Sequence, residues 1–201
     1  MEVLCYEVAF GSSEYEAAEQ VERDVFLANK YPYNYTKYRH QSHLLGAFTV
    51  DGQCVGALRL IATQPYEIPF FSGSDVVDPQ QWLDMQRRFE EVGTIAVLPH
   101  LEHQGVGMAL YREAWVNARK RGVTHWGIVL EQERVDFFND VLNFDFYPAA
   151  PLGWREPDSD RVWEDVGSFV ASIEACERKI AQNNPEEWAW LLDALPPQLR
   201  R

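Results

Sequence analysis

Basic residues are scarce in this chain, which has 18 Lys and Arg against 31 Asp and Glu in 201 residues and a net charge of −13. Nucleic acids and anionic membrane surfaces are held mainly by positively charged protein surfaces. The composition therefore argues against general binding to either of them. It also means that any anionic ligand must be held locally, by backbone N–H groups and a few basic side chains.

Cysteines and long apolar runs are also scarce. The three cysteines, Cys5, Cys54 and Cys176, are scattered and odd in number, so a reducing compartment is a simpler interpretation than a disulfide framework. No apolar run of the sequence approaches the roughly 20 residues that span a bilayer, and the N-terminal residues lack the positive region of a signal peptide. We therefore expect a soluble, cytoplasmic protein without a membrane span.

The most informative stretch runs from Glu91 to Leu110. Residues Val92 to Leu98 form a short apolar run rich in β-branched residues, which indicates a buried strand. Pro99 ends this strand, because proline has no N–H to donate to the ladder. Gln104-Gly-Val-Gly107 then opens a segment with apolar residues at helical spacing. A glycine-rich turn at a helix N-terminus presents N–H groups that suit a phosphate or pyrophosphate.

A glycine pair before a helix is, by itself, more often plain turn chemistry than a binding site. The longer combination is more specific: Val97-Leu-Pro99 followed by Gln104-Gly-Val-Gly-Met-Ala109 resembles the acyl-CoA-binding motif of the GNAT N-acyltransferase superfamily, Arg/Gln-x-x-Gly-x-Gly/Ala. The resemblance implies that acetyl-CoA or another acyl-CoA is the co-substrate, with its pyrophosphate held by backbone N–H groups. The cofactor-binding residues predicted in this way are Ile95, Ala96, Val97, Gln104, Gly105, Val106, Gly107, Met108 and Ala109.

The other segments follow the order expected of that superfamily. Strands are predicted over 3–10, 43–50, 54–63, 124–131 and 144–148, and helices near 13–28, 81–89, 108–121 and 134–142. The resemblance implies an α/β GNAT fold over residues 1–150, with a mixed central sheet that is splayed in its middle and flanked by helices. Residues 151–201 are predicted to form a linker and a helical extension, with a helical stripe from Val166 to Ile180. This extension is expected to pack on the domain or to form a homodimer.

Acyl transfer to an amine requires a base, because a primary amine with a pKa of roughly 8–10 is mostly protonated at pH 7. Glu91 is the predicted base, since many GNAT enzymes have a glutamate at this place on the strand. Strand alternation puts Glu91 on the face that also carries Gly93 and Ile95. A surface glutamate at the end of the strand is the structural alternative, as the neighbouring Glu90 illustrates.

Acyl transfer also requires a hydrogen-bond donor to the thioester carbonyl and an acid that protonates the leaving thiolate. The resemblance implies that a backbone N–H near Ala96 or Val97 polarises the thioester carbonyl. Family members often carry a tyrosine on the fourth helix as the general acid, but residues 137–139 of this chain include none. Tyr147 is therefore the predicted acid, with Tyr111 or water as alternatives.

A second resemblance concerns the autoinducer synthase and N-acyl amino acid synthase branch of the superfamily. Arg59, on a predicted strand, and Glu91 match the arginine and glutamate that line the acyl-transfer site in that branch, whereas Thr94 stands where autoinducer synthases have an arginine. Arg59 is therefore a predicted substrate-binding residue. Tyr33 and Tyr35 belong to an aromatic segment that forms either a surface loop or a substrate-facing wall, and they are the other two predicted substrate-binding residues.

The sequence thus predicts an N-acyltransferase, most simply an N-acetyltransferase, that acts on the primary amine of a small molecule or peptide. One alternative is a synthase of N-acyl amino acids or signals that uses a long-chain acyl-CoA or an acyl carrier protein. The acidity of the chain disfavours docking of an acidic carrier. Another alternative is a non-catalytic module that binds acyl-CoA. A metal site is not expected, because His100-Leu-Glu-His103 lacks a convincing third ligand.

Overall fold

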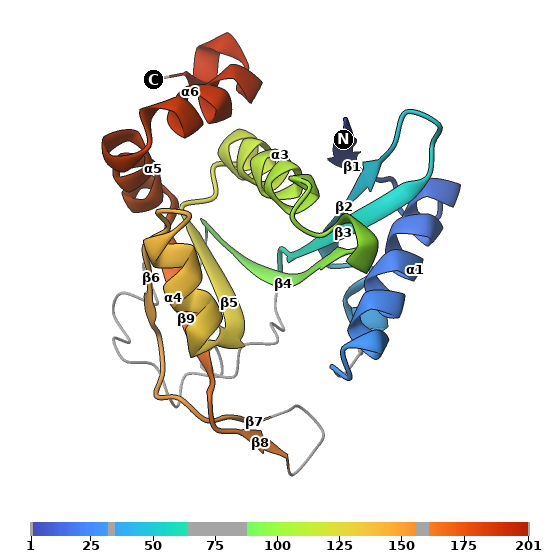
Figure 1. The fold of residues 1–201 in the computed structure, drawn as a ribbon, viewed down its shortest axis with the longest axis horizontal. Helices are drawn as coiled ribbons and strands as arrows, with labels where there is room; N and C mark the ends of the chain where they lie inside the picture. The colour runs from blue at the N-terminus through green and yellow to red at the C-terminus, as the bar shows by residue number, and fades with distance from the viewer. Residues whose placement is uncertain (1, 32–34, 64–87, 156–160, 201) are drawn as a thin grey trace. The chain divides into compact units, whose positions relative to one another are not determined.

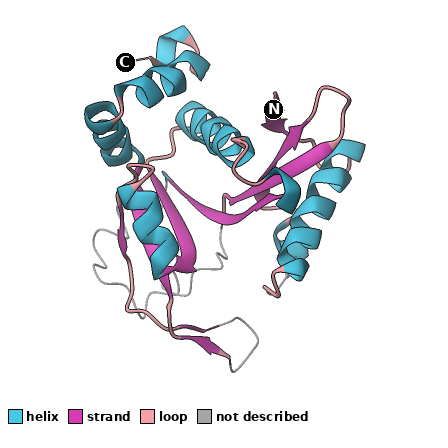
Figure 2. Cartoon of the chain, viewed as in Figure 1, coloured by secondary structure: helices cyan, strands magenta, loops and turns pink. Residues whose placement is uncertain are grey.

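The structure is a computed structural model that describes residues 2–31, 35–63, 88–155 and 161–200 (Figure 1). Seven strands form one sheet in the order β1-β2-β3-β4-β5-β9-β6, and β7 and β8 form a second, two-stranded sheet. The chain divides into two compact units, residues 1–64 with 92–117 and residues 65–91 with 118–201. Strand β4 (Phe89–Val97) and helix α3 (Val106–Arg121) each run from one unit into the other. The described chain combines helices with a seven-stranded sheet (Figure 2), which confirms the predicted α/β class.

The first unit is built on an antiparallel arrangement of three strands. They are β1 (Leu4–Glu7), β2 (Ser42–Phe48) and β3 (Cys54–Ile61), with β2 paired to both of the others. The connection from β2 to β3 turns at Asp51-Gly52. Gly52 has a φ of +85°, a conformation that glycine adopts without strain. Every residue of β3 is buried, which explains why this strand is almost wholly apolar.

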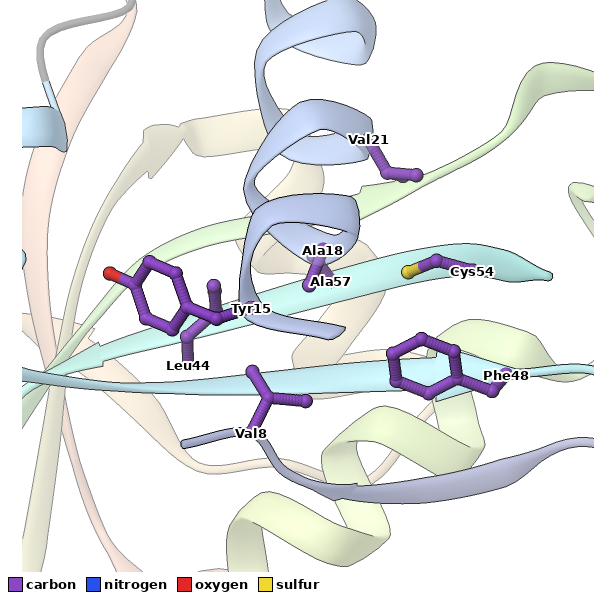
Figure 3. Close-up of a cluster of buried hydrophobic side chains, with 8 residues drawn as sticks. All are labelled: Val8, Tyr15, Ala18, Val21, Leu44, Phe48, Cys54 and Ala57. Atoms are coloured by element: carbon purple, nitrogen blue, oxygen red, sulfur yellow. The ribbon is translucent and has the colours of Figure 1, made fainter. Parts of the chain in front are cut away.

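Helix α1 (Ser13–Ala28) packs on β2 and β3, and its N-terminus is capped by Ser12, whose hydroxyl accepts a hydrogen bond from the N–H of Tyr15 at 3.1 Å. The cap satisfies one of the N–H groups that a helix start leaves without a partner. Apolar side chains from the helix and the strands meet between them (Figure 3). The buried members of this cluster are Val8, Tyr15, Ala18, Val21, Leu44, Phe48, Cys54 and Ala57.

Two glutamates on α1 are buried beside this cluster. Glu22 binds Arg59 of β3, and Glu19 binds Arg39, which follows the 3-10 turn η1 (Tyr35–Tyr38). The Nε atom of Arg39 lies 2.7 Å from Oε1 of Glu19. The hydrogen bonds from Arg39 hold the pKa of Glu19 below its ordinary value, although burial acts in the opposite direction.

The lowered pKa of Glu19 predicts a loss of stability in acid. A carboxyl group whose pKa is lower in the folded state stabilises the fold above its unfolded pKa, here 4.5, and this contribution disappears as the pH falls through the folded value. The difference in free energy of unfolding between wild type and Arg39→Gln is therefore expected to shrink as the pH falls below about 4.5. Urea denaturation between pH 6 and pH 3 measures it. A difference that is the same at all pH values would contradict this assignment.

The second unit is built around β9 (Val166–Ser172), which pairs antiparallel with β5 (His125–Glu131) on one side and with β6 (Phe146–Pro148) on the other. Its described helices include α4 (Gln132–Asp140), α5 (Ile173–Asn183), α6 (Pro185–Ala194) and the 3-10 turn η5 (Pro197–Leu199). The antiparallel pair of β7 (Trp154–Arg155) and β8 (Val162–Trp163) also belongs to this unit. Lys179 of α5 donates hydrogen bonds to the carbonyl oxygens of Asn139 and Phe144. It thereby fixes α5 to the end of α4.

The predicted helical stripe from Val166 to Ile180 is wrong in its first half. Residues Val166–Ser172 are the strand β9, and α5 begins only at Ile173, after the cap residue Ser172. All residues of β9 but the last are buried. A strand buried on both faces is apolar without alternation, so its sequence can be mistaken for that of a buried helix. An internal strand of the sheet thus lies beyond residue 150, and the division of the chain at that position stays a prediction.

Two further predictions concern helices. Most of the helix predicted over 81–89 lies outside the described residues. The last residue of that helix, Phe89, is instead the first residue of β4. The predicted helical extension includes α6, which begins at Pro185 after the cap residue Asn184. The side chain of Asn184 accepts a hydrogen bond from the N–H of Glu187.

The three cysteines are free thiols. Burial raises the pKa of Cys5 to about 12 and that of Cys176 to about 11, and it also raises the pKa of Cys54. Thiolates are therefore disfavoured at all three positions, so none of them is suited to act as a nucleophile. Among the helices of the described residues, none combines the length and the apolar character that crossing a membrane requires.

Candidate functional site

The loop after β4 makes a tight entry into α3. The N–H of Leu98 still donates to the carbonyl of Val55 on β3, at 3.0 Å, and Pro99–Leu101 then forms the 3-10 turn η4. His103 and Gly105 both have positive φ, at 61° and 84°. A Cβ atom on Gly105 would meet none of the described atoms within 4 Å. The backbone conformation, rather than crowding, therefore explains this glycine.

The start of α3 presents backbone N–H groups that the helix itself cannot satisfy. The N–H of Ala109 donates to the carbonyl of Gly105 at 3.0 Å, and that of Gln104 donates to Leu101 at 3.3 Å. The N–H groups between them, from Gly105 to Met108, precede the first intrahelical hydrogen bond and lie at the positive end of the helix dipole. Within the predicted set from Gln104 to Ala109, the first and last N–H groups thus have backbone acceptors. The four residues between them offer N–H groups that suit an anion.

Gly107, in the first turn of α3, and Gly56, on the neighbouring strand β3, are glycines for different physical reasons. Among the described atoms, a Cβ on Gly107 would meet only the Cδ1 of Ile95, at 3.9 Å, so the surrounding protein leaves room there for a side chain or a ligand. A Cβ on Gly56 of β3 would instead lie 3.0 Å from Val106 and 3.1 Å from Leu110. Gly56 therefore allows α3 to pack closely on the sheet, whereas Gly107 keeps its first turn open.

Strand β4 has a break in its alternation at Gly93 and Thr94. The hydroxyl of Thr94 donates to Glu22 of α1. A Cβ on Gly93 would lie 3.0 Å from Ile61, which is on the α1 face of β3. Two consecutive residues thus face α1, while Ile95 faces the start of α3. An interruption of this kind is typical of a β-bulge.

The bulge changes the interpretation of Glu91. Strict alternation predicts one common face for Glu91, Gly93 and Ile95, and this prediction is wrong because Gly93 and Ile95 face opposite sides. Glu91 is completely buried. Glu90 is also buried and is held by Arg121, with N–O distances of 2.7 and 3.0 Å. Neither residue is a surface glutamate, and complete burial of Glu91 is unusual for its residue type.

Arg59 is completely buried on the α1 face of β3. Its Nε and Nη2 atoms donate to Glu22 at 2.9 and 2.6 Å, and its Nη1 donates to Ser42 at 3.0 Å and to Tyr15 at 3.2 Å. Burial alone would lower the pKa of Arg59, but the hydrogen bonds and negative charge of Glu22 raise it above its ordinary value. Arg59 therefore ties α1 to the sheet, and its contact with a substrate stays a prediction.

Of the two tyrosines predicted to bind substrate, the structure describes one. Tyr33 lies outside the described residues. Tyr35 is buried, packs edge-on against Phe26 with 5.5 Å between ring centroids, and would lie 3.5 Å from a Cβ on Gly93. Tyr35 thus lines β4 at the bulge, and its contact with a substrate stays a prediction.

The general acid predicted at Tyr147 lies on β6 in the second unit, where it is partly exposed and pairs with Val170 of β9. The fourth helix has Asn139 in the region where many GNAT enzymes have a tyrosine. The side chain of Asn139 makes two hydrogen bonds with the backbone of Phe146, both at 2.8 Å. Asn139 therefore fixes the end of α4 to β6, and the role of Tyr147 as an acid stays a prediction.

Sequence reasoning missed Glu22, and with it the contact made by Thr94. In the sequence, Glu22 is one of several acidic residues on α1. Its one signal was position, because it lies one turn after Ala18 and next to Val21, on the buried side of the helix. A glutamate on an apolar face requires a buried partner, and Arg59 is that partner.

No family model matches the sequence, and no curated protein does. Solved structures do match. The N-acyl amino acid synthase FeeM, from uncultured soil microbes, has a TM-score of 0.65 at 14% identity, covering 90% of this chain and 99% of that one. The ribosomal-protein-S18-alanine N-acetyltransferase from Escherichia coli has a TM-score of 0.58 at 15% identity, covering 86% and 94%.

An acetyltransferase of the GNAT family from Staphylococcus aureus Mu50 has a TM-score of 0.53 at 8% identity, covering 86% of this chain and 99% of that one. The chain has the GNAT fold. Identities this low establish the fold and not the reaction, because one fold hosts many activities. Within the GNAT fold of this chain, the bulge of β4 precedes the open first turn of α3, with η4 between them.

Proposed function

We propose that this protein is an N-acyltransferase that transfers an acyl group, most simply acetyl, from acyl-CoA to the primary amine of a small molecule or peptide. The supporting observation is the first turn of α3, where the N–H groups from Gly105 to Met108 precede the first intrahelical bond and Gly107 leaves open space. This turn suits a pyrophosphate. A local site of this kind is needed in a chain of net charge −13.

The proposed chemistry assigns one task to each group. The first turn of α3 holds the donor, and a β4 backbone N–H near Ala96 or Val97 polarises the thioester carbonyl. Glu91 accepts the proton of the ammonium, directly or through water, so that the amine nitrogen attacks the carbonyl carbon. The C–S bond then breaks, and Tyr147 or water gives a proton to the departing thiolate.

One alternative function has a specific observation in its favour. The N-acyl amino acid synthase FeeM has a TM-score of 0.65 with this chain, over 90% of its length. A synthase of this type would take a long acyl chain from coenzyme A or from a carrier protein. Arg59, one of the two residues on which the sequence resemblance to that branch rested, is paired with Glu22.

Donor preference distinguishes these functions. Binding of a ligand stabilises the fold by about 2.7 kcal/mol when its concentration is a hundred times Kd, so thermal unfolding can be followed with coenzyme A, acetyl-CoA and a long-chain acyl-CoA. Stabilisation by acetyl-CoA, followed by turnover with amines, is the expected result. Stabilisation by the long-chain donor alone would support the synthase. Binding without turnover of any amine would indicate a non-catalytic module.

Gly107→Glu is expected to abolish binding of acetyl-CoA without destabilising the fold. The new carboxylate would repel the pyrophosphate, while the protein has room for the side chain. The first turn of α3 contains no acidic residue, so the helix dipole would favour the new carboxylate by about 0.3–1 kcal/mol. Calorimetry measures Kd and thermal unfolding measures stability.

Gly107→Gln is the matched control, since it adds a side chain of the same size without the charge. It is expected to weaken binding less than Gly107→Glu does. A Gly107→Glu variant that binds acetyl-CoA as tightly as wild type would refute the assignment of the phosphate site.

A further inference from the structure

The carboxylate of Glu22 is held in one orientation by Arg59. Oε1 accepts from the Nε of Arg59 at 2.9 Å, and Oε2 accepts from its Nη2 at 2.6 Å. Both side chains are completely buried. A bidentate pair of this kind fixes geometry as well as charge. Glu22 is therefore a rigid acceptor inside the first unit.

The third donor to this carboxylate is the hydroxyl of Thr94, which lies in the bulge of β4 and is itself buried. A bulged residue is left out of the regular ladder of backbone hydrogen bonds, so a side-chain hydrogen bond can determine its position. Thr94 stands three residues after Glu91 and immediately before Ile95, whose side chain lies next to Gly107. The bulge thus lies between the proposed base and the proposed carbonyl-binding part of β4.

We propose that Glu22 and Thr94 are positioning residues for acyl transfer. Their hydrogen bond fixes the bulge of β4 and so sets the position of the backbone N–H near Ala96 within the first unit. The inference rests on the proposed function. Neither residue touches the donor or the amine, and both act through the conformation of β4. A misplacement of about 1 Å in such a site can cost about a hundredfold in rate.

Thr94→Val removes the hydroxyl and keeps the branched shape of the side chain. It is expected to lower kcat by about 10- to 100-fold and to leave Kd for acetyl-CoA unchanged, because the phosphate site on α3 is untouched. Thr94→Ser keeps the hydroxyl and is expected to retain most of kcat. If Thr94→Val does not fold, Thr94→Ala removes the same hydroxyl without adding a methyl group.

Ser42→Ala is the matched control. It removes another hydroxyl that binds Arg59, at 3.0 Å from Nη1, but Ser42 is on β2. This variant is expected to lose thermal stability while kcat stays close to the wild-type value. An unchanged kcat in Thr94→Val, or an equal loss of kcat in Ser42→Ala, would overturn the proposal.

Amide hydrogen exchange tests the same link without an acceptor amine. Exchange at Ile95, Ala96 and Val97 is expected to be faster in Thr94→Val and unchanged in Ser42→Ala. If the wild type acylates no amine, the proposed function fails. Amide exchange then still tests whether the hydrogen bond between Glu22 and Thr94 fixes the conformation of β4. Unchanged exchange in Thr94→Val would overturn it.

Discussion

Arg59→Met is expected to lower the free energy of unfolding by about 3–5 kcal/mol, the usual cost of leaving one charge of a buried ion pair without its partner. Arg59 and Glu22 are both completely buried, so water cannot solvate the glutamate that remains. This loss is a large part of the 5–15 kcal/mol that stabilises a typical domain. Urea denaturation followed by circular dichroism measures it.

Arg39→Met is the natural comparison, because Arg39 also binds a glutamate of α1. Its side chain is 37% exposed, and exposed pairs typically contribute about 0–1 kcal/mol. Combining Arg59→Met with Glu22→Gln is expected to cost less than Arg59→Met alone, since no uncompensated charge then stays buried. An Arg59→Met variant no less stable than Arg39→Met would mean that this ion pair does not hold α1 to the sheet.

Glu91→Gln is expected to lower kcat by about 10²- to 10⁴-fold, the range that a general base contributes. Glutamine has the size of glutamate but cannot accept the proton of the attacking amine. Binding of acetyl-CoA is expected to stay at the wild-type level, because the N–H groups at the start of α3 do not involve Glu91. Steady-state kinetics with an amine found by screening, together with calorimetry, separate the two effects.

Glu90→Gln provides the control from the neighbouring position. Glu90 is also buried, but its carboxylate is engaged by Arg121. This variant is expected to lose stability and to keep most of kcat. Equal rates for Glu91→Gln and wild type would remove Glu91 from the mechanism. Equal losses in both variants would show that burial of charge, and not proton transfer, is what the two glutamates share.

Local chemistry made part of this protein predictable from its sequence. Pro99 ends the apolar strand because it has no N–H to donate, and Gly52 and Gly105 stand where the chain needs a positive φ. Asn184 and Pro185 begin a helix for equally local reasons, as a cap and a first-turn residue. The strand, turn and helix that form the proposed donor site are therefore determined within a few residues of each other.

The tertiary structure decided what depends on contacts between distant segments. Glu22 and Arg59 are 37 positions apart, and nothing in either segment alone shows that the other will neutralise it. The bulge at Gly93 and Thr94 reversed the alternation on which the face of Glu91 was predicted. Strand β9 is an apolar run whose neighbours on the sheet, rather than its own spacing, make it a strand. Propensity and periodicity act over a few residues, whereas burial, charge pairing and strand register are set by whichever distant residues pack alongside.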